Sequence, residues 1–375
     1  MGESGLREVH KKIIDAVIEK AKKVCPDSLA LVGIYGSVRT KEEHPRSDLD
    51  LLIVIDDDKG WQLSKTFILE GSVKPNMKTQ TDLRNPPQAV PLKSRDEDIG
   101  YDVYCTSWEM LEGDASCSHG HISKLMDSEI VYVRDEASLK HLENLRQKAA
   151  EVLSSDAVIG KVLEIRDQIS REYGNVATAD SIGMQRAHAA FMISLCFDAV
   201  ILWNHRYFKR SSKYVFEELK GLKVPENFSE NIDGIVQADN SENLMASATK
   251  LLKSMIAFTA TTSQKPAPTP ETIAGTYEES FSNWRNKMYD AMERGDVFSS
   301  FMNLACLQSM MDDIGSELDI PKFNVMEDYR SEDLKHNAEL FDSELERFGQ
   351  EYKKIGLEIQ RYKDVDDFVA AYLES

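Results

Sequence analysis

Apolar residues at the start of the chain recur at helical spacing. Val9, Ile13, Ile14, Val17 and Ile18 would share one face of a helix over about residues 6–24. The next apolar segment, SLALVGIYG, is continuous and rich in β-branched residues, which is typical of a buried strand. The pattern predicts that this strand ends at Gly36-Ser37.

Three further segments have the same strand character. They read LDLLIVIDDD, IGYDVYCTSW and EIVYVRD, and an amphipathic helix over residues 136–153 follows the last of them. Between the second and third lies the proline-bearing stretch 70–98, whose lack of periodicity predicts an irregular excursion. Mixed strands and helices indicate an α/β or α+β unit that ends near residue 154, and we predict the α+β class.

The strand signal disappears after residue 154. Amphipathic segments predict helices over about residues 158–174, 211–222 and 241–262. The segment 183–208 is apolar nearly all round, so we expect it at the centre of a helical bundle.

The apolar run 189–203 inside that segment is too short to span a bilayer and carries Asp198. We therefore expect a buried helix, no membrane association, and an Arg or Lys close to the Asp198 carboxylate.

The last part of the chain is again helical, with alternating apolar and charged faces over 298–314 and 337–362. A short Pro-rich stretch precedes it. The predicted organisation is an α+β domain over 1–154, a helical bundle over 155–264, a linker over 265–272 and a helical domain over 273–375.

Charge narrows the class of partner. The 375 residues include 64 acidic and 45 basic side chains, a net charge of −19. Such a surface repels phosphate backbones, so extended nucleic acid is not an expected partner. A small cationic molecule suits the charge better, although acidic surfaces also serve solubility alone.

Cysteine usage bears on the compartment. Five scattered cysteines without a CxxC pair do not form a disulfide framework, and the charged N-terminus lacks an apolar signal region. We expect a cytoplasmic protein.

Two carboxylates stand side by side in the second strand. Asp48 and Asp50 are two residues apart, so they project to the same face, while Leu49 and Leu51 turn to the other. Adjacent ionised carboxylates repel each other unless one is protonated, both face water, or a cation lies between them. Carboxylate oxygens are hard ligands that suit magnesium. Taken alone, a DxD is better explained by two solvated surface aspartates.

The surrounding residues favour the cation. Gly36 and Ser37 form a turn whose backbone N–H groups and hydroxyl can hold phosphate oxygens. Asp102 is a single carboxylate in the apolar third strand, with Val103 and Cys105 on the opposite face. A phosphate-binding turn opposite two metal ions held by three carboxylates is suited to nucleotidyl transfer. We therefore expect Asp48 and Asp50 to bind two magnesium ions, and Asp102 to complete one of the two sites or act as a base.

The segment GSVRTKEEHPRSDLDLLIV resembles the signature of the polymerase-β nucleotidyltransferase superfamily. A Gly-Ser pair, a Pro and then Ser-Asp-x-Asp-Leu agree in type and order, at Gly36, Ser37, Pro45, Ser47, Asp48, Asp50 and Leu51. The chain is most similar to the kanamycin, streptomycin and lincosamide nucleotidyltransferases, which join such a domain to a helical bundle. The motif resemblance covers roughly the first 135 residues. Many relatives carry an Arg-Gly pair after the Gly-Ser, whereas here Arg39 stands near that place, followed by Thr40 and Lys41.

The resemblance implies an enzyme that transfers a nucleoside monophosphate, AMP from ATP, to a hydroxyl of a small acceptor such as an aminoglycoside. Gly36 and Ser37 would bind the triphosphate. Relatives often place a lysine of the bundle against the nucleotide, and Lys213, in the basic segment NHRYFKRSSKYVF, matches it. A solvated basic turn is the alternative interpretation of that segment.

The proton acceptor is open among several carboxylates. Candidates are Asp102 itself, Glu109, Glu164 and Asp167. The segment CSHGH at 117–121 lacks a fourth ligand at recognisable spacing, so a plain loop is favoured over a zinc site.

Two other functions remain as alternatives. The acceptor of the nucleotide could be a protein side chain or an RNA end, with the charge balance against RNA. The chain could also be a non-catalytic nucleotide-binding module, with the last helical domain as the surface for a partner protein. The intact set of three carboxylates favours an enzyme.

Overall fold

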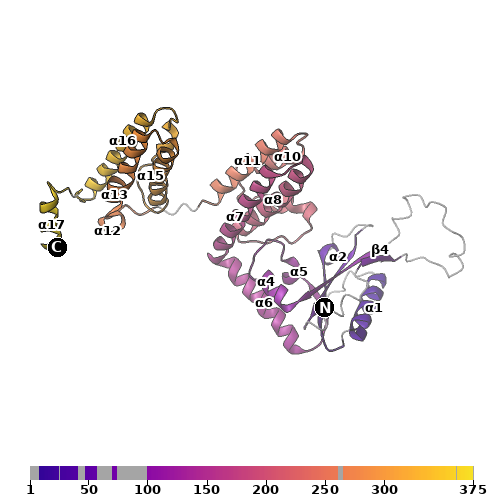
Figure 1. Ribbon diagram of the computed structural model, residues 1–375. Coiled ribbons are helices and arrows are strands. Elements are labelled where there is room, and N and C mark those ends of the chain that lie inside the picture. The colour runs from indigo at the N-terminus through magenta and orange to yellow at the C-terminus, as the bar shows by residue number, and fades with distance from the viewer. Residues whose placement is uncertain are drawn as a thin grey trace. The chain divides into compact units, whose positions relative to one another are not determined.

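The computed structural model describes residues 8–24, 26–40, 47–56, 70–73, 99–260, 265–359 and 361–374. The chain divides into two compact units, Met1–Ala260 and Thr261–Ser375 (Figure 1). Pro45 and Lys41 of the sequence motif, Cys25, and most of the excursion 74–98 fall outside the described residues.

A mixed five-stranded sheet forms the base of the first unit. Its order is β3-β4-β2-β1-β5, and β2 and β4 are parallel while the other pairs are antiparallel. The strands are β1 (Leu29–Tyr35), β2 (Leu49–Ile55), β3 (Glu70–Val73), β4 (Ile99–Ser107) and β5 (Glu129–Val133).

The expectation of an irregular excursion was wrong at its first four residues. They form β3, which pairs with the start of β4. The sequence EGSV has no alternating pattern, so the hydrogen bonds to a neighbouring strand create this edge strand and local preference does not.

The two faces of the sheet are covered by different elements. Helix α1 (Glu8–Val24) packs on one face, where Ile13 and Ile14 meet Leu49, Leu51 and Val103. The other face carries Leu52 and Val54, whose core continues into α4 (Trp108–Ala115), α6 (Glu136–Ser154) and the bundle. The predicted alternation along β2 and β4 is thereby confirmed, because the aspartates lie on the bundle side.

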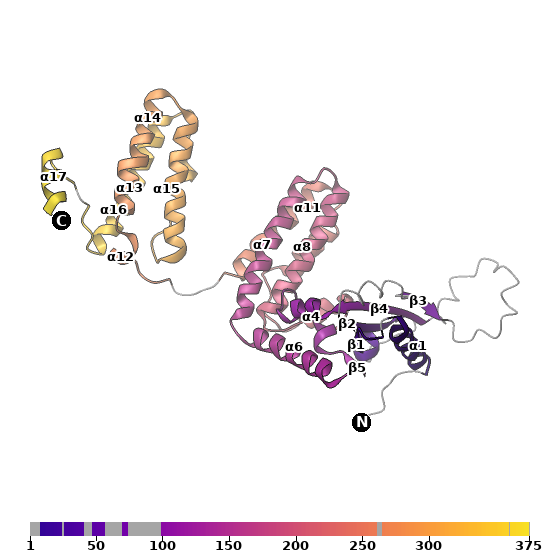
Figure 2. The same cartoon turned by 60° about the horizontal axis from the view of Figure 1, so that its bottom comes forward.

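The bundle consists of long helices joined to the sheet through α6. They are α7 (Ala157–Thr178), α8 (Ile182–Trp203), α10 (Phe228–Val236) and α11 (Ser241–Phe258), and α7 and α8 lie side by side in Figure 2. The predicted helix over 211–222 is shorter than expected, a 3-10 turn η3 (Ser212–Tyr214) followed by α9 (Val215–Glu218).

Helix α8 is the most apolar helix of the bundle. Ten of its 22 residues are buried, and Cys196 to Leu202 form an unbroken buried run. Among the described residues α8 alone is long and apolar enough to cross a membrane, with half of its most apolar window buried inside the protein. Length and composition of this kind are also those of a core helix in a soluble protein.

The second unit is helical. It contains α12 (Pro270–Ile273), α13 (Thr276–Glu279), the π-helix η4 (Ser280–Arg285), α14 (Asn286–Arg294), α15 (Val297–Glu317), η5 (Val325–Asp328), α16 (Leu334–Lys354) and α17 (Val365–Glu374). Its core has aromatic rings from α13 and α16, including Tyr277, Phe341, Phe348 and Tyr352. Helix α16 ends at Lys354, whereas the amphipathic pattern predicted that the helix would continue to residue 362.

Candidate active site

Two of the predicted aspartates face each other on neighbouring strands. Asp50 of β2 pairs in register with Asp102 of β4, and both side chains are half-buried. Asp48 lies exposed just before β2, and its carboxylate borders Gly100, where a Cβ would be 3.2 Å from Asp48 Oδ1. Parallel pairing of β2 and β4 therefore gathers the three carboxylates near the start of β2, the central strand of the sheet.

The electrostatics reflect this proximity. Burial, the charge of Asp48 and the charge of Asp102 together raise the pKa of Asp50 to about 6. Tyr35, the partner of Asp50 in β1, has its pKa raised by burial and then by Asp50, Asp102 and Tyr104. The site thus concentrates negative charge on a partly buried surface.

Gly36 makes room for one of these carboxylates. Its φ is +71°, in the left-handed region that favours glycine. A Cβ at this position would overlap the Asp50 carboxylate, 2.7 Å from Cγ. The turn at the end of β1, continued by the short helix α2 (Gly36–Thr40), therefore lies directly against the predicted metal-binding residues.

Ser37 follows in the first turn of α2 and is half-buried. Its carbonyl accepts a hydrogen bond from Thr40 Oγ1 at 3.2 Å. The backbone of the turn is thereby held in place beside Asp50.

The three aspartates are neighbours, not a closed ligand cage. Within the described ranges, no group of three or more His, Cys, Asp or Glu side chains is drawn together tightly enough to enclose a metal ion. The donor set nevertheless suits a divalent cation, because carboxylates of like charge are gathered where a cation would relieve their repulsion.

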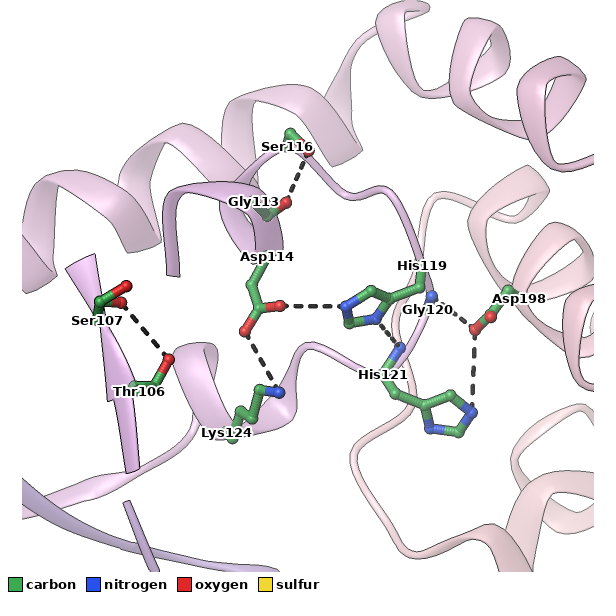
Figure 3. Close-up of polar contacts among 10 residues, drawn as sticks. All are labelled: Thr106, Ser107, Gly113, Asp114, Ser116, His119, Gly120, His121, Lys124 and Asp198. Atoms are coloured by element: carbon green, nitrogen blue, oxygen red, sulfur yellow. Dashed lines mark hydrogen bonds and ion pairs between the residues drawn. The ribbon is translucent and has the colours of Figure 1, made fainter. Parts of the chain in front are cut away.

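A cation that the sequence analysis missed lies on the same face of the sheet. Lys124 of α5 (Ser123–Met126) places its Nζ 4.3 Å from the centre of the Tyr104 ring. The same atom lies 3.6 Å from Asp114 Oδ2 (Figure 3). Tyr104 follows Asp102 by two residues, so it projects to the carboxylate face. The neighbouring residues in the sequence form no basic cluster around Lys124. The sequence therefore contained no sign that this lysine lies on the carboxylate face.

Asp114 fixes the direction of that lysine. Its side chain is about nine-tenths buried and also binds His119, with 3.1 Å between Oδ1 and Nε2. The Nδ1 atom of His119 accepts a hydrogen bond from the backbone N–H of His121, so the ring donates to Asp114 through Nε2 (Figure 3).

The prediction of an Arg or Lys partner for Asp198 was wrong. Its Oδ1 accepts the backbone N–H of Gly120 at 2.7 Å and lies 3.9 Å from His121 Nε2 (Figure 3). Burial raises the pKa of Asp198 and lowers that of His121. The loop and α8 approach each other closely here, and a backbone donor needs less space than a long cationic side chain.

The segment CSHGH forms a loop whose side chains point to protein partners. The buried Cys117 thiol donates to the Ala149 carbonyl at 3.6 Å, and the His121 ring stacks on Phe208 with 4.8 Å between centroids. Together with the Asp198 contact, the loop joins the sheet region to the bundle.

Lys213 lies exposed in η3, and its Nζ is 5.0 Å from the centre of the Tyr214 ring. The guanidinium of Arg210 stacks on the same ring at 3.5 Å and pairs with Glu217 at 2.9 Å. The segment is tied to the N-terminal part of the unit, because the Phe208 N–H donates to the Gly120 carbonyl at 2.8 Å. This contact holds the start of the segment against the loop at Gly120.

The other carboxylates considered as proton acceptors are exposed. Glu109 lies in the first turn of α4, Glu164 pairs with Lys161 at 3.1 Å, and Asp167 is 3.8 Å from Arg166. Asp102 differs from them because it is half-buried beside Asp50.

Comparison with known proteins agrees with this geometry. Residues 10–99 match the family model described as a nucleotidyltransferase domain. The N-terminal part of the chain is therefore similar to nucleotidyltransferase domains. The matched range includes Gly36, Ser37, Asp48 and Asp50 and stops three residues before Asp102. Such a domain supports nucleotidyl transfer in general terms.

Comparisons with solved structures and with curated proteins give no further support for the fold or the function. A solved structure, a nucleotidyltransferase-like protein from Exiguobacterium sibiricum, is 11% identical with a TM-score of 0.32, covering 82% of this chain and 92% of its own. That score is too low to support an argument about the shared fold. No curated protein matches the chain.

Proposed function

We propose that the chain transfers a nucleoside monophosphate, AMP from ATP, to a hydroxyl of a small cationic acceptor and releases pyrophosphate. The observation that carries the proposal is the pairing of Asp50 with Asp102 beside Asp48, directly against the Gly36 turn. This arrangement joins a carboxylate cluster to a backbone turn able to approach phosphate.

Asp48, Asp50 and Asp102 are the residues that would hold two magnesium ions. The raised pKa of Asp50 is consistent with this role, since it arises from burial and from the charges of Asp48 and Asp102. Magnesium, when bound, would neutralise phosphate charge and increase the acidity of the acceptor hydroxyl.

The chain provides separate groups for the phosphates. Gly36 and Ser37 would contact them through the backbone and the hydroxyl, because no side chain at Gly36 blocks their approach. Lys124 is a cation already on the carboxylate face, and Lys213 is the lysine that family resemblance favours. Both would counter the charge of the triphosphate and of the leaving pyrophosphate.

The acceptor must bring its hydroxyl to the three carboxylates near the start of β2. Asp102 is the candidate base, because it lies beside Asp50, whereas Glu164 already has a lysine partner. An excess of carboxylates around the site and a net charge of −19 favour an acceptor with amino groups. An aminoglycoside is the type of molecule with this chemistry.

The test is magnesium-dependent release of pyrophosphate from ATP with an aminoglycoside acceptor. Asp48→Asn and Asp50→Asn should each reduce turnover at least a hundredfold, because each removes a charged ligand. Asp15→Asn is the matched control, since Asp15 is exposed on α1, which covers the opposite face. Full activity in Asp48→Asn would refute the assignment.

The choice of acceptor has its own test. Cell extract incubated with labelled ATP would be separated into protein, RNA and small molecules. Label on a protein or RNA would replace the small acceptor while leaving the chemistry intact. ATP binding without consumption under all these conditions would instead indicate a non-catalytic nucleotide-binding module.

A further inference from the structure

The second unit contains a cavity of about 860 Å³. Its walls come from α13, η4, α16 and the segment that follows α16, and they include Tyr277, Phe281, Arg285, Lys353 and Arg361. The volume lies within the range of pockets that hold small ligands, roughly 300–1,000 Å³. Nothing in the proposed transfer reaction uses these residues.

A π-helix forms one wall of this cavity. Helix η4 has six residues, Ser280–Arg285, and it carries both Phe281 and Arg285. Segments of π-helix are rare and occur frequently at functional sites, because they sacrifice regular hydrogen bonding to redirect side chains. This wall of the cavity therefore combines an uncommon backbone conformation with an aromatic and a cationic side chain.

The Arg285 side chain is fixed before any ligand arrives. Its Nε and one terminal nitrogen donate to the two carboxylate oxygens of Asp342, at 2.6 and 3.0 Å. Tyr289 donates its hydroxyl to the same carboxylate at 2.6 Å. Asp342 is thus neutralised, and the wall carries an aromatic ring and a guanidinium in a set position.

Arg361 lies over the Phe281 ring. Its guanidinium carbon is 4.8 Å from the ring centre, and the residue is exposed. Neither Arg361 nor Lys353 forms an ion pair with another residue in the described ranges. Their donors therefore face the cavity without a carboxylate partner there.

The cavity is less negative than its surroundings. Its lining has three bases, Arg285, Lys353 and Arg361, and three acids, Asp342, Glu346 and Glu358. Residues 261–375 as a whole contain 12 Lys and Arg against 24 Asp and Glu. With Asp342 held by Arg285, the cavity offers cations beside aromatic rings in an otherwise acidic unit.

We propose that this cavity binds a small ligand that joins a flat aromatic ring to an anionic group. The ring stacks on the Arg361 guanidinium, which Phe281 supports from behind, because guanidinium groups stack on planar rings. The anionic group accepts hydrogen bonds from Lys353 and Arg361. Glu346 and Glu358 disfavour ligands that carry more negative charge than one phosphate group.

The test uses the full chain in EDTA and isothermal titration calorimetry with 5′-AMP as the probe. AMP should bind, whereas adenosine, which lacks the anion, and ribose 5-phosphate, which lacks the ring, should each bind at least tenfold more weakly. Arg361→Gln should weaken AMP binding about tenfold or more, since it removes a charge-assisted contact.

Arg347→Gln is the matched control. The guanidinium of Arg347 lies 4.3 Å from the Phe323 ring in the same unit but outside the cavity. This variant should bind AMP as the wild type does. Arg361 is exposed, so Arg361→Gln should keep the wild-type melting temperature, which separates lost binding from lost folding.

Binding at the aspartates gives a different result from binding in this cavity. If AMP affinity falls in Asp50→Asn and is unchanged in Arg361→Gln, the nucleotide lies at the catalytic site and the proposal is overturned. Absence of AMP binding, or equal binding of adenosine and AMP, overturns it as well. Loss of pyrophosphate release with AMP binding intact would instead refute only the proposed transfer reaction.

Discussion

Gly36 and Asp50 lie directly against each other where β1 ends and β2 begins. The Asp50 carboxylate occupies the space that a Cβ of residue 36 would need. Gly36 has a φ of +71° at the end of β1, and Asp50 pairs with Tyr35 one residue earlier. Position 36 therefore needs a glycine for two reasons. Its backbone is left-handed, and the Asp50 carboxylate leaves no space for a Cβ.

Gly36→Ala should lower the free energy of unfolding by about 2–4 kcal/mol and abolish pyrophosphate release. The left-handed conformation costs an alanine about 1–2 kcal/mol, and the overlap with Asp50 adds to it. Denaturant unfolding and a turnover assay measure the two effects. Gly221→Ala is the control, because Gly221 also has a positive φ, +79°, but no atom within 4 Å of a Cβ. It should lose only about 1–2 kcal/mol and stay active.

Asp50→Asn should make the protein more stable in EDTA above about pH 6. The pKa of Asp50 is about 6 in the folded protein, whereas an aspartate in an unfolded chain has a pKa of 3.8. Between these values the folded state binds more protons, so its stability falls as pH rises. Asparagine has no such loss, so the gain should be about 1–2 kcal/mol at pH 8 after allowance for partial exposure, and near zero at pH 3.5.

Asp56→Asn at the other end of β2 provides the comparison. Asp56 accepts from Trp108 Nε1 at 2.6 Å and pairs with Arg134 at 2.5 Å, so its replacement should reduce stability at pH 8. Urea unfolding at pH 3.5 and pH 8 measures both variants. A destabilised Asp50→Asn at pH 8 would contradict the charge repulsion described for the site.

Lys124→Gln should weaken nucleotide binding about tenfold with little change in melting temperature. The substitution removes the ammonium from the carboxylate face, while Asp114 keeps its contact with His119. Calorimetry with magnesium and a non-hydrolysable ATP analogue measures the affinity. Lys213→Gln should be compared in parallel. A loss confined to Lys213→Gln would assign the phosphate contact to the bundle lysine alone.

Gly120→Ala should disrupt the contact between the loop and α8. A Cβ at Gly120 would overlap the Ile201 methyl group and lie 3.1 Å from Asp198 Oδ1. The expected loss is about 2–3 kcal/mol, as for overpacking in a core. Gly113→Ala, inside α4 with no atom within 4 Å of a Cβ, should instead stabilise by up to about 1 kcal/mol. Thermal and urea unfolding distinguish the two, and equal effects would contradict close packing at Gly120.

The local pattern determined the elements around the site. Alternation along DLDLLIV places Asp48 and Asp50 opposite Leu49 and Leu51, and both leucines lie in the core beneath α1. Helical periodicity likewise predicted α6, α7 and α11, because such faces must be buried to be stable. These features depend on residues close together in the chain.

The hydrophobic pattern did not predict which residues far apart in the chain would contact each other. The sequence EGSV has no strand signal of its own, and the partner of Asp198 could be guessed only as a cation. Lys124 lies 22 residues beyond Asp102 along the chain, yet packs on Tyr104 beside it. Each relationship depends on which strands and loops become neighbours.

By itself, the sequence determined a strand with two carboxylates on one face, a glycine turn before it, and helices after it. The tertiary structure decided that Asp102 stands opposite Asp50 and that Lys124 reaches the same face. The physical reason is that side-chain direction follows from the local period of two, whereas register follows from hydrogen bonds and packing between segments far apart in the chain.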